Sequence, residues 1–129
     1  MSHTSSALLH TRVLWELVRY DVLYGVRGLQ GVRPPAMRTR PRDEAAGNAV
    51  QAAIWQALTA IAPFYWKPIL CLQRSVVTAR LMRRYGVAAE VVIGYRAKPF
   101  FSHAWVEVAG RVVNDSPSYQ RRLNVLERL

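Results

Sequence analysis

Apolar residues recur every three or four positions near the start of the chain, between residues 7 and 29. The pattern comprises eight residues: Leu8, Leu9, Val13, Leu14, Leu17, Val18, Val22 and Leu23. This spacing is typical of one face of a helix, and it leaves charged residues such as Arg12 and Glu16 largely elsewhere on the helix surface. Gly28 and Gly31 indicate where the helix ends.

Two more helices are predicted further along the chain. Residues 31–42 form a linker rich in proline and arginine, and Asp43 is a suitable N-cap for a helix that continues to about residue 61. The connector that follows, residues 63–68, cannot continue this helix because it begins and ends with proline. A third helix is expected over residues 71–85, with Gly86 at its C-terminal end.

The hydrophobic period changes to that of strands after the third helix. Residues 87–95 are apolar and β-branched, which is typical of a buried strand. Residues 103–108 alternate as a strand with one buried face, and a tight turn at 109–110 leads into a partner strand over 111–114. We expect residues 116–129 to dock as an irregular tail. The predicted fold class is therefore α+β, with N-terminal helices followed by a small antiparallel sheet.

This order of elements predicts one compact domain with two parts. Residues 1–43 supply the amphipathic helix and the basic linker, and residues 44–129 supply the core. The longest apolar stretch, residues 45–66, carries Asn48 and Gln51, so we interpret it as a buried helix rather than a membrane span. No uninterrupted apolar segment of a secretion signal is found near the N-terminus, and a single cysteine fits a reducing compartment. We therefore expect a cytoplasmic protein.

The net charge of +10 favours an anionic partner. The arginines are dispersed, and neither an aromatic RNA-binding signature nor zinc-finger spacing accompanies them, so we expect no nucleic acid. An acidic peptide or protein is the more specific alternative. One cysteine and three histidines argue against a metal cluster, and no glycine-rich phosphate loop is present. The sequence therefore gives no reason to expect a metal or a cofactor.

The single cysteine, a strand histidine and an aspartate fall in an order that suits a cysteine hydrolase. Cys71 opens the third helix, whose free N–H groups favour a thiolate and can bind the oxyanion of a tetrahedral intermediate. His103 and Asp115 follow on the predicted hairpin, so the three side chains predict a nucleophile, a base and an orienting carboxylate. The alternative is that Cys71 is a small buried apolar residue and that His103 is structural.

The expected hairpin register brings Asp115 near His103. If residues 109–110 form the turn, Ala104 lies opposite Asp115, and His103 is its diagonal neighbour. Residues 114–117 equally fit ordinary turn chemistry, so spacing alone leaves both interpretations open. Glu107 shares the side of the strand that carries His103, and we expect it to be exposed to solvent.

A resemblance narrows the assignment. The segments CLQRS (71–75), LMRRYGV (81–87), VIGYR (92–96), PFFSHAWVE (99–107) and VVND (112–115) resemble the peptidases that mature lasso peptides, in the transglutaminase-like branch of papain-like folds. The resemblance covers about residues 63–116. It implies a cysteine protease that removes the leader peptide from a ribosomally made precursor.

The resemblance also assigns roles and partners. It implies that Cys71 is the nucleophile, His103 the general base and acid, and Asp115 the orienting carboxylate. The oxyanion would be held by the Cys71 N–H and by a second donor, for which there are three candidates: Gln51, Trp66 and Gln73.

Some members of this family carry a fused leader-recognition domain, and we expect no room for one of about 80 residues here. The expected partners are then the precursor leader, a small leader-recognition protein and the lasso cyclase. The N-terminal helix and residues 63–66 are the expected contact surfaces. Two alternatives remain: a transglutaminase-like acyltransferase or amidase, and a non-catalytic basic binding module.

Overall fold

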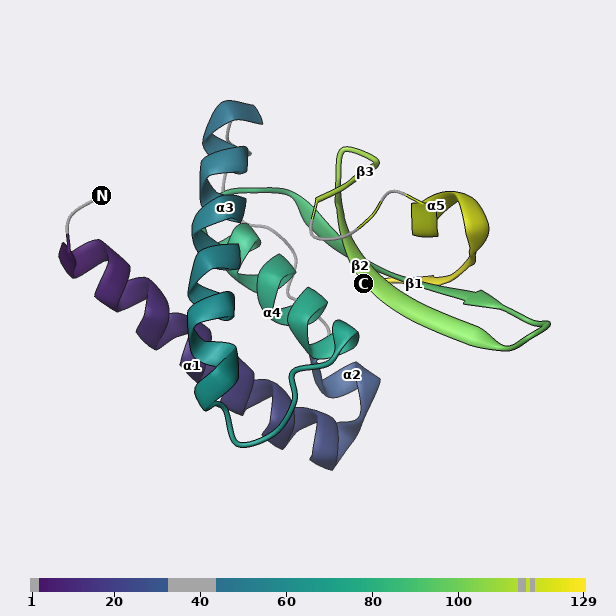
Figure 1. Cartoon of the computed structure of the whole chain (residues 1–129), viewed down its shortest axis with the longest axis horizontal. Coiled ribbons are helices and arrows are strands. Elements are labelled where there is room, and N and C mark those ends of the chain that lie inside the picture. The colour runs from purple at the N-terminus through teal and green to yellow at the C-terminus, as the bar shows by residue number, and fades with distance from the viewer. Residues whose placement is uncertain (1–2, 33–43, 114–115, 117) are drawn as a thin grey trace.

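The computed structural model describes residues 3–32, 44–113, 116 and 118–129 of the chain (Figure 1). The helices are α1 (His3–Arg27), α2 (Leu29–Val32), α3 (Glu44–Ile61), the 3₁₀ turn η1 (Ala62–Phe64), α4 (Cys71–Arg84) and α5 (Ser118–Arg122). The strands are β1 (Ala89–Arg96), β2 (Phe101–Val108), β3 (Arg111–Val112) and β4 (Asn124–Arg128). Most of the predicted linker and the predicted N-cap Asp43 lie outside the described residues, and the domain division at residue 43 stays a prediction.

The four strands form one antiparallel sheet in the order β3-β2-β1-β4. Val91 and Val106 point into a core shared with α1, α3 and α4, whereas Val92 and Trp105 pack against Leu123. Because side chains alternate between the two faces of a strand, the helical layer covers one face and the segment with α5 covers the other, as Figure 1 shows. This arrangement confirms the predicted α+β class.

Helix α1 has two apolar sides, whereas its pattern predicted one. Leu9, Val13 and Leu17 are buried in the helical layer. The opposite side, which we call the outer face of α1, carries exposed apolar residues: Leu8, Trp15, Val18, Val22 and Val26. The single-face prediction was wrong because both sides share the helical period. Glu16 is a second correction, since it is 6% exposed and pairs with Arg80 at 2.7 Å.

Helix α4 begins where the sequence predicts and ends within one residue of the prediction. Leu70 precedes it with an extended backbone, and Cys71 is its first residue. At the other end, Gly86 has a φ of 88°, a left-handed conformation that glycine adopts without steric cost. The helix body is largely buried against the sheet and α1. The core therefore fixes the position at which Cys71 lies.

The hairpin between β2 and β3 confirms the predicted register. Residues 109–110 have φ values of 51° and 77°, as a tight two-residue turn requires. Val108 pairs with Arg111, and the Val113 N–H donates to the Val106 carbonyl at 3.0 Å. Strand β3 is shorter than predicted.

The predicted irregular tail is wrong, because this segment forms α5 and β4. Strand β4 pairs antiparallel with β1, and Leu129 exchanges backbone hydrogen bonds with Val91 at 2.8 and 3.3 Å. The pairing shifts register between Ile93 and Gly94. Such a shift breaks the alternation of apolar residues that makes a strand recognisable. Within the described part of the chain, no helix is both long and apolar enough to cross a bilayer.

Candidate active site

Cys71 is half buried at the first position of α4. No side chain caps this end, and Arg74 N–H donates to the Leu70 carbonyl at 2.9 Å. The backbone N–H groups of the first turn therefore point toward the end at which Cys71 lies. Such an end carries partial positive charge, which favours a thiolate and the oxyanion of an acyl-transfer intermediate.

A polar network ties the connector before α4 to helix α1. Asp21 accepts a hydrogen bond from the Tyr65 hydroxyl and pairs with Lys67 Nζ at 2.9 Å. Lys67 Nζ also donates to Gln73 Oε1 at 2.8 Å, and Gln73 Nε2 donates to the Leu17 carbonyl at 3.1 Å. We call Asp21, Tyr65, Lys67 and Gln73 the Asp21 network. Its members flank the start of α4 on both sides and hold it against α1.

The protonation states of this network are set by its own contacts. Burial raises the pKa of the Asp21 carboxyl, but hydrogen bonds from Tyr65 and Lys67 outweigh burial, so the pKa lies below its ordinary value of 3.8. Burial, with donation to Asp21, raises the pKa of Tyr65. Near neutral pH Asp21 is therefore ionised and Tyr65 is protonated, which are the states that their hydrogen bond requires.

Tyr20 lies beside this network and was missed in the sequence. Its side chain is 8% exposed, and its ring stacks on Tyr24 with centroids 5.4 Å apart. Burial first, and then electrostatic interaction with Tyr24, Asp21 and Cys71, raises the pKa of Tyr20 well above its usual range. A signal was present, because Tyr20 continues the helical spacing of the buried residues before it.

His103 lies on β2 within an aromatic cluster. Its ring centroid is 4.0 Å from that of Tyr119 in α5, 6.1 Å from Phe101 and 6.5 Å from Trp105. Trp105 packs with Leu123 and Tyr119 on the sheet face that α5 covers. The imidazole therefore lies on this face of the sheet.

The structure does not gather the predicted nucleophile and base on one face of the sheet. Helix α4, which starts with Cys71, covers the face that holds Val106, whereas His103 shares the other face with Trp105. Asp115 lies outside the described residues. The catalytic triad therefore stays a prediction.

The three predicted oxyanion donors lie in different surroundings. Gln51 is half buried on α3. Trp66 is 75% exposed, and Lys67 Nζ lies 5.8 Å from its ring centroid. Gln73 is 2% exposed, and its amide nitrogen donates to the Leu17 carbonyl. A donor role for any of the three stays a prediction.

Glu107 is buried, and this corrects the expectation that it is exposed. It is 3% exposed, and it accepts hydrogen bonds from Trp105 Nε1 at 2.8 Å and from Arg128 Nη1 at 3.1 Å. Hydrogen bonding to Glu107 raises the pKa of Arg128. The expectation failed because Arg128 belongs to β4, a strand that the sequence did not predict.

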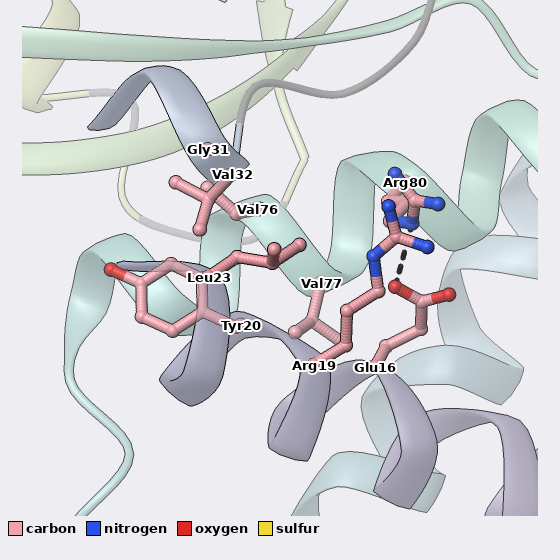
Figure 2. A pocket seen from close by; sticks show the side chains of 9 residues that line it. All are labelled: Glu16, Arg19, Tyr20, Leu23, Gly31, Val32, Val76, Val77 and Arg80. Carbon is pink, nitrogen blue, oxygen red and sulfur yellow. Dashed lines mark ion pairs between the residues drawn. The ribbon is translucent and has the colours of Figure 1, made fainter. Parts of the chain in front are cut away.

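Figure 2 shows a small pocket between α1, α2 and α4 that the sequence also did not predict. Val32 and Val77 give it an apolar lining, and the Glu16–Arg80 ion pair lies at its side. Tyr20 borders it with its hydroxyl turned away from the other lining side chains. Among the described residues, no three His, Cys, Asp or Glu side chains gather as metal ligands do.

Comparison with known proteins identifies relatives of this chain. Residues 14–128 match the family model of the transglutaminase-like superfamily. The microcin J25-processing protein McjB of Escherichia coli is 41% identical over 59 residues, which make up 46% of this chain and 28% of McjB. The matched segment is thus well under half of that protein's length. No solved structure matches the chain.

Proposed function

Because this chain belongs to the transglutaminase-like superfamily, we propose that it is a cysteine protease that removes the leader peptide from a lasso-peptide precursor. Removal frees the N-terminal amine of the core peptide for ring closure by a separate cyclase. The likeness to a protein named for processing microcin J25 supports this substrate class. So does the combination of CLQRS at 71–75 with HAWVE at 103–107.

The observation that carries the proposal is the position of Cys71. It is the single cysteine of the chain, and it is the first residue of a helix whose N-terminus no side chain caps. A thiolate is the reactive form of cysteine, and a helix N-terminus stabilises it. A structural cysteine gains nothing from this position, whereas a nucleophile gains both charge stabilisation and an oxyanion site.

The reaction proceeds in two acyl-transfer steps. The Cys71 proton passes to His103, and the sulfur attacks the scissile carbonyl, whose oxygen takes the negative charge near the Cys71 N–H. The tetrahedral intermediate collapses, the C–N bond breaks, and His103 returns the proton to the leaving amine of the core peptide. Water then hydrolyses the thioester and releases the leader. Asp115 is proposed to orient the imidazole.

In this proposal, His103 leaves its stack on Tyr119 to reach the Cys71 sulfur. The lost stack costs about 1 kcal/mol beyond the area it buries, and the start of β2 must also reorient, because His103 faces away from the side of the sheet that α4 covers. In this proposal, the rearrangement accompanies binding of the precursor, because a bound peptide shifts an equilibrium toward the conformation it prefers.

We further propose that a small leader-recognition protein delivers the precursor. The outer face of α1 supports this idea, because Trp15 is 62% exposed, Val22 58% and Val26 75%. An exposed apolar surface of this kind is typical of an interaction site. The lasso cyclase is the second proposed partner, and it would receive the freed core peptide.

The partner proposal can be tested on the outer face of α1. We expect Val22→Glu to abolish co-purification with the leader-recognition protein encoded beside the precursor. Gln56→Glu, at an exposed position on α3, is the matched control and should retain it. Equal binding by both variants would contradict the proposed surface.

The protease proposal is tested with purified protein, its precursor and the leader-recognition protein. We expect mass spectrometry to detect the free leader acid and the core peptide. Cys71→Ala should form neither, while keeping the circular dichroism spectrum and thermal midpoint of the native chain. Cleavage by Cys71→Ala at the native rate would contradict the proposal. A leader–amine conjugate after addition of an external amine would favour the transglutaminase-like alternative.

A further inference from the structure

We propose that Arg74 binds a carboxylate of the leader peptide next to the scissile bond and so helps to determine which bond is cut. This inference rests on the proposed function, because it takes Cys71 as the nucleophile that the precursor approaches. It deepens that proposal by assigning a specificity-determining residue to α4, the helix that Cys71 begins.

The position of Arg74 on α4 places it beside Cys71. The two residues lie three positions apart at the start of the helix, and Cβ atoms at this spacing are about 5–6 Å apart on one face. Side chains on a helix lean toward its N-terminus, so Arg74 covers the turn that carries Cys71. The Arg74 N–H donates to the Leu70 carbonyl at 2.9 Å, which closes this turn. A peptide bond presented to the Cys71 sulfur therefore lies within reach of the Arg74 side chain.

A tryptophan on α3 holds the guanidinium of Arg74. Arg74 Cζ lies over the Trp55 ring, 5.9 Å from its centroid, a distance at which an indole face attracts a cation. Trp55 is 45% exposed, and Arg74 is half buried. No hydrogen bond joins the guanidinium to another residue that the structure describes. Its N–H donors therefore remain available to a planar anion.

The charge of Arg74 is not compensated within the described residues. Lys67, on the other side of Cys71 in the chain, pairs with Asp21 at 2.9 Å. Further along α4, Arg80 pairs with Glu16 at 2.7 Å. Arg74, in contrast, forms no ion pair with any acidic side chain that the structure describes. Its positive charge therefore attracts an anion that comes from outside the chain.

The chemistry of the substrate indicates which anion this is. The anionic groups of an unmodified ribosomal peptide are carboxylates, and a guanidinium binds a carboxylate through two parallel N–H···O bonds. Two carboxylates of the leader have this chemistry: an acidic side chain near the scissile bond, and the terminal carboxylate that hydrolysis creates. Either group is repelled by a nearby thiolate, and the charge of Arg74 offsets that repulsion.

The first test compares the rates at which iodoacetate and iodoacetamide alkylate the single cysteine at neutral pH, followed by intact mass. Both reagents form the same kind of bond to sulfur, but only iodoacetate carries a carboxylate. The ratio of the two rates therefore reports attraction of the carboxylate and cancels any change in the thiolate fraction. We expect Arg74→Gln to lower the ratio of the iodoacetate rate to the iodoacetamide rate about tenfold, because local charge raises the encounter rate of an oppositely charged ligand by at least this factor.

Arg84→Gln is the matched control for this test. Arg84 is exposed at the other end of α4, so the substitution removes the same charge from the same helix. It should leave the ratio within about twofold of the native value, because salt screens exposed charges beyond about 8–10 Å. A native ratio in folded Arg74→Gln, or an equal fall in Arg84→Gln, would overturn the inference.

Arg74→Lys is a second, conservative variant that keeps the charge and loses the two-pronged donor. We expect the ratio to fall about threefold, because a lysine ammonium cannot bind a carboxylate through a planar fork. This variant decides the question if Arg74→Gln does not fold. In that case, an unchanged ratio in Arg74→Lys would overturn the inference.

The second test identifies the carboxylate that Arg74 binds. Synthetic leader peptides that end in a carboxylate or in a carboxamide are compared for protection of Cys71 from iodoacetamide, with the recognition protein present. Stronger protection by the acid form, lost in Arg74→Gln, identifies the terminal carboxylate. Equal protection by the two forms, weakened in Arg74→Gln, identifies an acidic side chain. No protection, or the same protection of native protein and Arg74→Gln by both peptides, would overturn the inference.

Alkylation by iodoacetate needs no precursor, so the two proposals fail separately. A protein that never cleaves the precursor but has an Arg74-dependent ratio contradicts the protease and keeps a carboxylate site beside Cys71. A protein that cleaves the precursor with an Arg74-independent ratio contradicts only the role of Arg74.

Discussion

Cys71 and His103 lie in regions that are held together by different forces. Around Cys71, side chains of the Asp21 network bond to one another at 2.8 to 2.9 Å and to the Leu17 carbonyl of α1 at 3.1 Å. Around His103, aromatic rings stack with centroids 4.0 to 6.5 Å apart. Hydrogen bonds and ion pairs are directional and costly to break once buried, whereas each stacked pair contributes about 1 kcal/mol beyond its buried area. The nucleophile is therefore held in place by directional polar bonds, whereas the base is held by aromatic contacts that cost less to break.

The largest expected effect comes from removing the imidazole. We expect His103→Ala to lower the rate of leader removal at least about a hundredfold, because general acid–base catalysis typically contributes 10²–10⁴-fold. The measurement is the initial rate of core-peptide release. Ser102→Ala, at the exposed neighbouring position, is the matched control and should cleave at the native rate. A His103→Ala rate within twofold of native would contradict the assigned base.

The Asp21 network near Cys71 can be disrupted by substituting Asp21 itself. Asp21→Asn removes the ion pair with Lys67, both side chains of which are less than one third exposed (16% and 30%). We expect the free energy of unfolding to fall by about 1–2 kcal/mol and the thermal midpoint by about 5 °C. Leader removal should slow as well, because the start of α4 loses its attachment to α1. An unchanged thermal midpoint would contradict the role of the network.

The Asp21 carboxylate also makes the stability of the native chain depend on pH in the acid range. Because the pKa of Asp21 is lower in the folded chain than its ordinary value of 3.8, the ion pair stabilises the fold fully above about pH 5. That stabilisation is lost as the pH falls through the lowered folded-state pKa. The free energies of unfolding of the native protein and of Asp21→Asn, measured as a function of pH, should therefore converge toward pH 2. A difference in free energy that stays constant down to pH 2 would argue against an ionised Asp21.

A smaller effect is expected from removing the aromatic ring that stacks on His103. Tyr119→Leu removes the ring at 4.0 Å from His103 but keeps apolar cover over Trp105. If His103 leaves this stack during catalysis, we expect leader removal to rise up to about fivefold, which corresponds to about 1 kcal/mol. Tyr119→Phe keeps the stack and should remain near the native rate. A loss of activity in folded Tyr119→Leu would show that the stacked position is the working one.

The smallest effect is expected at Glu107, on the same side of the sheet. Glu107→Gln keeps an acceptor for Trp105 Nε1 and loses the charge that pairs with Arg128. We expect the thermal midpoint to fall by only about 2–3 °C, since Arg128 is 48% exposed. Glu90→Gln is the matched control: its carboxylate also pairs with Arg128, but it is 53% exposed, so no change should be measurable. Equal effects in both variants would contradict the importance of burial.

The sequence predicted the elements whose signals are local. The helix that begins at Cys71, the glycine end at Gly86 and the hairpin turn at 109–110 each depend on residues within a few positions, and the structure confirms them. Strand β4 depends on pairing with β1 across about 30 residues of chain and on a register shift, so no local pattern identified it.

The site was predictable in part for the same reason. The placement of Cys71 at a helix start and of His103 on a strand followed from local patterns. Which face of the sheet each would occupy did not, because alternation separates two faces without saying which one the helices cover. Asp21 was missed because its importance comes from the Asp21 network, which joins α1 to residues more than forty positions away.

The most direct test of the proposed mechanism is to trap the thioester between Cys71 and the leader peptide. Native protein mixed with precursor and its recognition protein is quenched in acid after a short time, and its intact mass is measured. The account predicts an added mass equal to the leader less one water, located at Cys71 by peptide mapping. Release of leader without this adduct, together with cleavage by Cys71→Ala at the native rate, would contradict it.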